Sequence, residues 1–216
     1  CSSDLNSPRQ TFASDVLPGD IKYKDVNGDG VINYDDLIPL KYSNVPQIQY
    51  GFATEFYWKN WTLSVLFGGV SRVQYYVGGT GFVPFEQKET GNILKIVADQ
   101  KNRWTAASFS GDPTTENANA RFPRLSYGSN ANSTIGSTFW LRDGSYLRLK
   151  NVQLTYTFNK SWLRKLYMTG ASISLIGENL HLWDHGDKIF DPTQASGNGA
   201  AYPLQRVYTL QLNVSL

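Results

Sequence analysis

Between Asp25 and Asp36 the chain gathers four aspartates and two asparagines, a density of oxygen donors that suits a hard cation. Positions 1, 3 and 5 of this segment are Asp25, Asn27 and Asp29, which would offer side-chain oxygens. Position 6 is glycine, position 7 is Val31 with its carbonyl oxygen, and position 12 is Asp36, which would close the loop with a carboxylate. This order matches an EF-hand-like loop and predicts a structural Ca²⁺ site.

The same residues also suit a loop that holds no metal. In that alternative, Asx hydrogen bonds staple a hydrated turn, and Gly28 and Gly30 supply positive φ angles. Under the metal interpretation, Asn33 at position 9 would ligate the ion directly or through water. The sequence leaves both interpretations open.

Other residues that could perform chemistry are sparse. His181 and His185 lie four residues apart beside Asp184, which on a helix would make half of a metal site, but no helix is predicted there. The segment Gly78–Gly81 lacks the lysine of a phosphate-binding loop. No catalytic cysteine and no Ser–His–acid grouping is visible at local spacing. We therefore do not expect an enzyme.

Aromatic residues in the irregular segments are the remaining candidates for ligand contact, because they can stack on sugar rings or peptide side chains. The alternative is that they pack the loops together or lie at a membrane interface. The candidates are Tyr75, Tyr76, Trp104, Trp140 and Trp183. The sequence assigns none of them to a ligand, and the ligand site stays unknown.

The composition bounds the class of protein. The 216 residues are 14% aromatic and 18% charged, which is too aromatic for a disordered chain. A formal net charge of +2 gives no reason to expect a nucleic-acid partner. The chain has no apolar run of about 18 residues. Its mean hydropathy of −0.36 fits a soluble protein and a transmembrane barrel equally well, since only alternate barrel residues face lipid.

Residues 1–17 stay unassigned. Cys1, the single cysteine, excludes an internal disulfide framework. It suits the lipidated first residue of a lipoprotein, an ordinary residue of a cropped chain, a reactive thiol, or the translated product of a sequencing adapter covering residues 1–5. We exclude these first residues from the inference about the fold.

Strict alternation of apolar and polar residues predicts about five strands of the length that a tilted membrane-spanning strand needs. The clearest is the last, in which Tyr208, Leu210, Leu212 and Val214 oppose Thr209, Gln211 and Asn213. The alternation slips near residues 150–151, which indicates a β-bulge or the end of a membrane span. The five strands are expected around Ile48–Trp58, Trp61–Phe67, Val152–Phe158, Ile173–Leu175 and Tyr208–Leu216.

The connections alternate in length. Residues 59–60 form a two-residue turn and residues 159–170 a modest one, whereas residues 71–143 and 181–205 are long and rich in Gly, Asn, Ser and Thr. Outer-membrane barrels show this asymmetry, with short turns on the periplasmic side and long loops outside. The first 47 residues then form an extracellular loop. One helix is expected inside the long loop, at Ile93–Trp104.

A soluble β-sandwich also alternates apolar and polar residues, so alternation alone does not choose between the two folds. A structureless loop of about 70 residues argues against a compact sandwich. The two folds differ in where the apolar faces point, because in a barrel they form one lipid-facing band and in a sandwich they converge on a core. The rival to a barrel is thus a secreted, calcium-stabilised β-sandwich that binds carbohydrate.

From about Pro18 to Leu216 the chain resembles the C-terminal part of SusC/RagA-type TonB-dependent transporters of Bacteroidetes-like bacteria. The resemblance covers roughly nine tenths of the chain, and several blocks follow one another in the same order. They are Pro18–Gly30, Pro46–Gln47 with Tyr50–Phe52, Leu63–Phe67, Ala120–Leu125, Phe139–Val152, Gly177–Leu180, Phe190–Pro192, Tyr202–Val207 and the terminal strand.

The resemblance implies an all-β fold in which residues 18–216 form the C-terminal part of a large transmembrane β-barrel with long extracellular loops, in the cell outer membrane. It implies import of oligosaccharides or peptides, energised by a TonB complex acting through an N-terminal part that this chain lacks. The implied partners are a SusD-like surface lipoprotein and outer-membrane lipid. Substrate and oligomeric state are not readable.

Overall fold

The computed structural model describes residues 7–86, 88, 91–186, 191–194 and 201–216. Cys1 and Phe190, named above, lie outside these residues. The chain divides into two compact units. We call Tyr42–Gln74, Asp143–Gln194 and Tyr202–Leu216 the sheet unit, and Cys1–Lys41, Tyr75–Arg142 and Ala195–Ala201 the loop unit.

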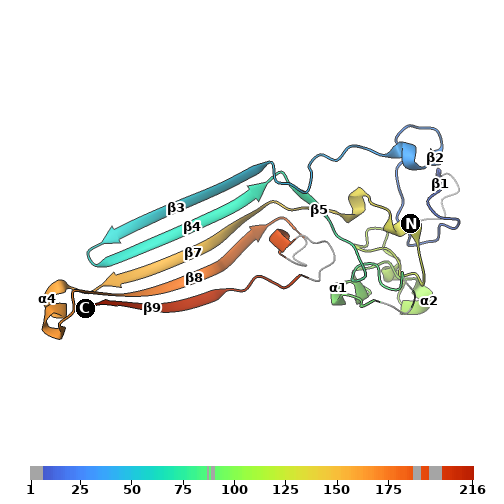
Figure 1. Cartoon of the computed structure of the whole chain (residues 1–216). Coiled ribbons are helices and arrows are strands. Elements are labelled where there is room, and N and C mark those ends of the chain that lie inside the picture. The colour runs from blue at the N-terminus through green and yellow to red at the C-terminus, as the bar shows by residue number, and fades with distance from the viewer. Residues whose placement is uncertain (1–6, 87, 89–90, 187–190, 195–200) are drawn as a thin grey trace. The chain divides into compact units, whose positions relative to one another are not determined.

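The sheet unit contains the five predicted strands, which form one antiparallel sheet in the order β3-β4-β7-β8-β9 (Figure 1). The prediction of an all-β fold with about five antiparallel strands is confirmed. The strands are β3 (Ile48–Trp58), β4 (Trp61–Ser71), β7 (Tyr146–Thr157), β8 (Gly170–Asp184) and β9 (Val207–Ser215). β3 has the predicted bounds and β9 is shifted by one residue, whereas β4, β7 and β8 run longer than the alternating segments of the sequence.

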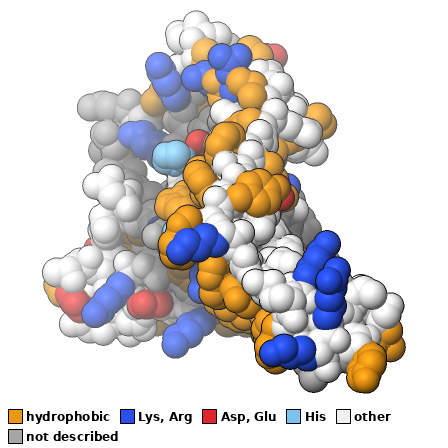
Figure 2. Space-filling view, turned by 90° about the vertical axis from the view of Figure 1, so that its left-hand side faces the viewer, with side chains coloured by type: hydrophobic (Ala, Val, Ile, Leu, Met, Phe, Trp, Pro, Cys, Tyr) orange, Lys and Arg blue, Asp and Glu red, His pale blue; other side chains and the backbone are white. Residues whose placement is uncertain are grey.

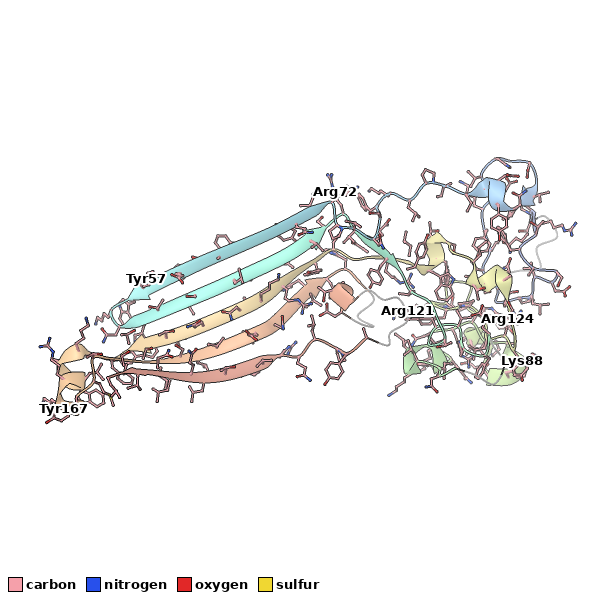
Figure 3. The ribbon with its side chains drawn as sticks, viewed as in Figure 1. Tyr57, Arg72, Lys88, Arg121, Arg124 and Tyr167 are labelled. Atoms are coloured by element: carbon pink, nitrogen blue, oxygen red, sulfur yellow. The ribbon has the colours of Figure 1, made fainter. Side chains whose placement is uncertain are left out.

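The connections at one end of the sheet are short, as predicted. Lys59 and Asn60 join β3 to β4, and Lys59 adopts a φ of 55°. Between β7 and β8 lie α4 (Lys160–Leu163) and the 3₁₀ turn η4 (Arg164–Leu166), which begin where Asn159 accepts a hydrogen bond from the Ser161 amide. Figure 3 shows Tyr57 and Tyr167 at this end of the sheet and Arg72 at the other.

The predicted slip near residue 150 is a β-bulge. The partners of β7 change from Leu149 opposite Phe67 to Asn151 opposite Leu66, so Lys150 is an extra residue. On the other side, β8 moves from His181 to Glu178 over the same interval, and Asn179 adopts a φ of 53°. The bulge explains why Leu147 and Leu149 alternate out of step with Val152.

The loop unit is built from short elements. β1 (Arg9–Gln10) pairs in parallel with β2 (Val31–Ile32), and β5 (Gln74–Tyr76) pairs with β6 (Leu141–Asp143). The expected helix at Ile93–Trp104 is wrong in extent, because α1 covers only Lys95–Ala98 and its cap Leu94 makes no side-chain hydrogen bond. The other turns are η1 (Tyr34–Asp36), α2 (Ala107–Ser110), η2 (Pro113–Thr115), α3 (Ala131–Thr134) and η3 (Thr138–Trp140); η5 (Pro192–Gln194) belongs to the sheet unit.

Buried apolar side chains concentrate in the loop unit, so its long segments are not structureless. Ile32, Phe82, Val97, Phe122 and Trp140 are each at most 3% exposed. Among the described residues of the five long strands, none is a buried apolar side chain, which contradicts convergence of their apolar faces on a sandwich core. No helix among the described residues is long and apolar enough to span a membrane.

Candidate functional site

The segment from Asp25 to Asp36 forms a closed loop in which side-chain oxygens accept hydrogen bonds from the backbone. Asp25 accepts from the amides of Gly28 (2.6 Å) and Gly30 (2.9 Å). Asp29 accepts from the amide of Val31 (2.8 Å). Asp36, the residue at position 12 of the loop, accepts from the amides of Val26 (2.7 Å) and Asn33 (2.9 Å).

These bonds leave acceptor capacity for a cation. An ionised carboxylate has about four lone-pair sites, and Asp25 and Asp29 each use two of theirs, the second of Asp29 on the Asn27 side-chain amide. The backbone bonds from Asn33 and Val26 lower the pKa of Asp36, so its carboxylate is ionised at neutral pH. Carboxylate, amide and carbonyl oxygens are the donors that Ca²⁺ prefers, but the described residues contain no cluster of three or more His, Cys, Asp or Glu side chains placed to hold a metal.

A buried polar network fixes the chain that leads into this loop. Asp20, whose side chain is fully buried, pairs with Arg124 Nε at 2.7 Å and accepts from Asn130 Nδ2 at 2.8 Å. The Leu17 amide donates to the same carboxylate at 2.9 Å. Gly19, at a φ of 91°, lets the backbone lie close to the Trp104 ring, since a Cβ there would lie 2.2 Å from that ring. The network joins segments more than a hundred residues apart in the sequence.

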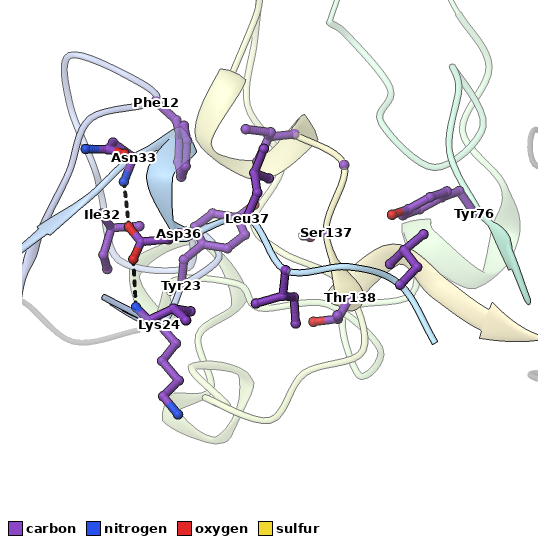
Figure 4. A pocket seen from close by; sticks show the side chains of 15 residues that line it. Phe12, Tyr23, Lys24, Ile32, Asn33, Asp36, Leu37, Tyr76, Ser137 and Thr138 are labelled. Carbon is purple, nitrogen blue, oxygen red and sulfur yellow. Dashed lines mark hydrogen bonds between the residues drawn. The ribbon is translucent and has the colours of Figure 1, made fainter. Parts of the chain in front are cut away.

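A cavity of about 320 Å³ lies beside the loop, within the loop unit (Figure 4). Its walls include Ile32, Asp36 and Leu37 from the end of the loop, and Tyr76 and Thr138 from later segments. Tyr23 also lines it; its hydroxyl donates to the Asn132 carbonyl at 2.7 Å, and burial raises its pKa to about 12. The cavity is mainly apolar.

The five aromatic candidates for ligand contact differ in burial and in position. Tyr75 and Trp140 are buried, and the Trp140 indole donates to the Ser133 carbonyl, so both pack the loop unit. Trp104 packs beside Gly19. Tyr76 is 42% exposed and lines the cavity, and of the five it remains the best placed for a ligand. The fifth, Trp183, belongs to a strand.

His181 and Trp183 lie in β8 and not in a loop as expected. Their rings pack with a centroid distance of 4.3 Å, and Trp183 lies 6.3 Å from Phe67. His181 and His185 line one hollow of about 500 Å³, with Asp184 between them in the chain. The described residues contain no cluster of three His, Cys, Asp or Glu side chains that could hold a metal here.

The register of the five strands places all apolar residues of the alternating pattern on one face. Leu63 pairs with Leu154, Leu154 with Leu175, and Leu175 with Leu210. Leu63 is half-buried, whereas Leu154, Leu175 and Leu210 are exposed, Leu210 by 72% and Leu175 by 54%. Figure 2, which looks at the sheet from the α4 end, shows hydrophobic side chains gathered in a band.

Aromatic side chains border this band at both ends. At the short-turn end Trp61 packs on Tyr156, Tyr156 on Phe158 and Phe158 on Trp162, with ring centroids 4.8–5.8 Å apart. At the other end lie Tyr50, Phe67, His181 and Trp183, where Gly69 leaves room for the Tyr50 ring. Trp61 and Phe67 are six residues apart, or about 20 Å along the strand. An apolar band of about 25 Å between two aromatic girdles is the pattern of a transmembrane barrel wall.

The opposite face is polar. Glu55 accepts from Ser64 (2.9 Å), and Thr155 shares a hydrogen bond with Ser174 (2.8 Å). Gln211 donates to Asn213 at 3.1 Å on the same face. Toward the end of this face that lies away from α4, Arg148 forms an ion pair with Asp191. The sequence pattern gives no signal for this contact.

Comparisons with known proteins agree with this geometry. No family model matches the chain. The chain is 30% identical to TonB-dependent receptor P26 of Formosa agariphila over 209 residues, which cover 91% of the chain and 20% of the receptor. It is 25% identical to TonB-dependent receptor P3 of the same organism, over 94% of the chain and 20% of that receptor.

Two solved structures share the fold. The RagAB peptide importer in its open-open state matches with a TM-score of 0.60 and 24% identity, over 87% of this chain and 19% of that one. The structure of the RagAB peptide transporter matches with a TM-score of 0.62 and 24% identity, over 92% and 20% of the two chains. The chain is therefore a relative of the TonB-dependent receptors that shares its fold with the RagAB structures, and it spans about one fifth of the length of the relatives that it matches.

Proposed function

We propose that the chain forms part of the wall and outer loops of a transporter that imports nutrients across the bacterial outer membrane. The observation that carries the proposal is the two-faced sheet, whose exposed apolar face is bordered by aromatic side chains at both ends. Such a face is stable against lipid, and the polar face then bounds an aqueous lumen. The relation to TonB-dependent receptors supports the same assignment.

The activity of a whole transporter would need parts that lie beyond this chain. We propose that a TonB complex energises import through those parts, and that a SusD-like lipoprotein covers the outer opening. The substrate would be an oligosaccharide or a peptide. The named relatives are receptors and importers, which agrees with a protein that transports and does not catalyse.

We further propose that the Asp25–Asp36 loop binds Ca²⁺ and that the ion orders the outer loops. The proposal rests on the oxygen donors and on charge, because Asp25, Asp29, Asp35 and Asp36 place four carboxylates in twelve residues. The bound cation would offset their mutual repulsion. Asn27 and the Val31 carbonyl would complete the donor set.

The transport proposal is tested by the facing of β9 in the full-length receptor in intact outer membranes. Single cysteines replace Leu210 on the apolar face and Gln211 on the polar face, and a small membrane-impermeant maleimide is added. The cysteine at 211 should react, and the cysteine at 210 should react at least tenfold more slowly, because lipid excludes the reagent. Equal reactivity, or the reverse order, would contradict the proposal.

A further inference from the structure

Arg148 and Asp191 form an ion pair on the polar face of the sheet. Arg148 lies in β7 opposite Gly68 of β4 and Leu182 of β8, so its side chain belongs to the face that carries Gln153. The Arg148 side chain is 5% exposed and that of Asp191 is 14% exposed. Both carboxylate oxygens of Asp191 contact Nη2 of Arg148. The pair therefore connects a strand to the segment between β8 and β9.

Asp191 also shapes the turn that follows it. Its Oδ1 accepts from the amide of Thr193 (2.9 Å) and from the hydroxyl of Thr193 (2.6 Å), which fixes η5 (Pro192–Gln194). Pro192 is buried, whereas Thr193 is exposed. Burial raises the pKa of the Asp191 carboxyl, but the bonds from Arg148 and Thr193 outweigh that effect and lower it. One ionised carboxylate thus holds the turn together and fastens it to the strand.

The surroundings of Arg148 favour a fixed position for this turn. The guanidinium carbon lies 5.6 Å from the ring of Tyr146, which stands on the same face two residues earlier. A buried guanidinium needs a compensating charge, and breaking such a pair costs far more than removing a surface one. Asp191 supplies the compensating charge here. The turn cannot leave the polar face without exposing both charges or leaving one of them unpaired.

We propose that the Arg148–Asp191 pair is a strap that holds η5 against the polar wall and thereby narrows the outer end of the lumen. The inference rests on the proposed function, because the polar face bounds a lumen only if the apolar face meets lipid. In this proposal Arg148 positions η5, and η5 in turn limits the size of the solute that can pass through the lumen.

The experiment uses the full-length receptor in outer membranes. Nitroxide labels at Thr193→Cys and Gln153→Cys report the distance between the turn and the wall. The variant Asp191→Asn removes the charge and keeps the shape of the side chain. Asp184→Asn is the matched control, because Asp184 lies on the same face near the same end and accepts a hydrogen bond from the Gly186 amide. The double reversal Arg148→Asp with Asp191→Arg restores a pair.

The strap predicts that Asp191→Asn lengthens and broadens the distance distribution, that Asp184→Asn leaves it unchanged, and that the double reversal restores it. An unchanged distribution in Asp191→Asn overturns the strap. Failure of the double reversal to restore the distance also counts against it, provided that the receptor still folds, as shown by heat-modifiable migration.

A second readout tests the narrowing. Gln211→Cys on the polar wall is labelled from outside by a small maleimide and by a long polyethylene-glycol maleimide. The rate ratio of long to small reagent should rise at least tenfold in Asp191→Asn and stay constant in Asp184→Asn. A constant ratio in both variants overturns the narrowing. If Leu210→Cys reacts and Gln211→Cys does not, the facing is wrong and the proposed function fails, whatever the distance measurement shows.

Discussion

At the scale of single residues, two ion pairs connect separate blocks of the family resemblance. Asp20 of Pro18–Gly30 pairs with Arg124 of Ala120–Leu125, and Arg148 of Phe139–Val152 pairs with Asp191 of Phe190–Pro192. Each pair joins segments that no local pattern relates. The charged residues of these blocks thus hold loops in place, which is a structural reason for their presence.

Replacing Asp20 by Ala should destabilise the loop unit by roughly 3–5 kcal/mol, because Arg124 and Asn130 would lose a buried partner. The measurement is the rate of proteolysis of the outer loops in the full-length receptor. Asp15→Ala is the control, since Asp15 is exposed and its carboxylate accepts a hydrogen bond from the neighbouring Ser14 hydroxyl. Equal proteolysis of both variants would contradict a supporting role for the Asp20 network.

The loop from Asp25 to Asp36 gives a second prediction at this scale. Calcium should protect it from protease in the full-length receptor, and chelation should expose it. Asp29→Ala removes a proposed ligand and should weaken binding at least tenfold by calorimetry, whereas Asp35→Ala, at position 11, should change it little. Equal protease resistance with calcium and with chelator would favour the hydrated turn, in which the hydrogen bonds accepted by Asp25 and Asp29 hold the loop.

At the scale of elements, alternation decided which face of each strand is apolar, and pairing decided how the faces combine. Leu63, Leu154, Leu175 and Leu210 form one row across four strands, and the bulge at Lys150 keeps Leu149 on the same face as that row. Without the extra residue, the outer half of β7 would turn its apolar side chains to the polar face. The bulge therefore keeps the band continuous up to Phe67 and Trp183.

Arginine substitutions in β9 test this arrangement energetically. Leu210→Arg should cost about 2–4 kcal/mol in the free energy of folding into vesicles, because Leu210 lies near the middle of the apolar band. Gln211→Arg, on the opposite face of the same strand, should leave the free energy of folding nearly unchanged, because its side chain meets water. Equal costs, measured by denaturant titration of the full-length receptor, would contradict the assignment of the faces.

At the scale of the whole molecule, the sheet has two open edges. Within the part of the chain that the structure describes, β3 and β9 are each paired on one side only, which leaves a row of amide and carbonyl groups without strand partners. Lipid cannot supply hydrogen bonds to such edges, so a spanning sheet must close on further strands. The exposed apolar face must in addition be covered by lipid, because it is not stable against water.

Expressed alone, the chain should accordingly be insoluble or disordered in water, and it should form no heat-modifiable band in detergent. The physical cause is the pair of open edges together with the exposed apolar band. Gel filtration, calorimetry and heated against unheated electrophoresis measure this. A soluble monomer with a cooperative melting transition would contradict the interpretation of the sheet as part of a larger barrel.

The sequence by itself determined the presence of the five strands, their faces and the short turns, since each follows from a local period of two residues or from neighbouring side chains. It located the slip near residue 150 but left a β-bulge and the end of a membrane span as alternative causes. It also supplied the candidate oxygen donors of the Asp25–Asp36 loop, which stay a prediction. Two local expectations were wrong. The helix predicted over Ile93–Trp104 is a single turn, Lys95–Ala98, and the Leu94 side chain makes no capping hydrogen bond at its start. His181 and Trp183 lie in β8, because the pairing of β7 with β8 continues past the bulge to Asp184.

Only the tertiary structure decided which distant charges meet and which aromatic residues remain accessible. Asp20 and Arg124 are separated by 104 residues, and Arg148 and Asp191 by 43. Periodicity carries no information over such separations, because pairing there depends on how whole loops fold back. The same holds for Tyr76, which lines a cavity while its neighbour Tyr75 is buried, since burial is set by the segments that pack against each side.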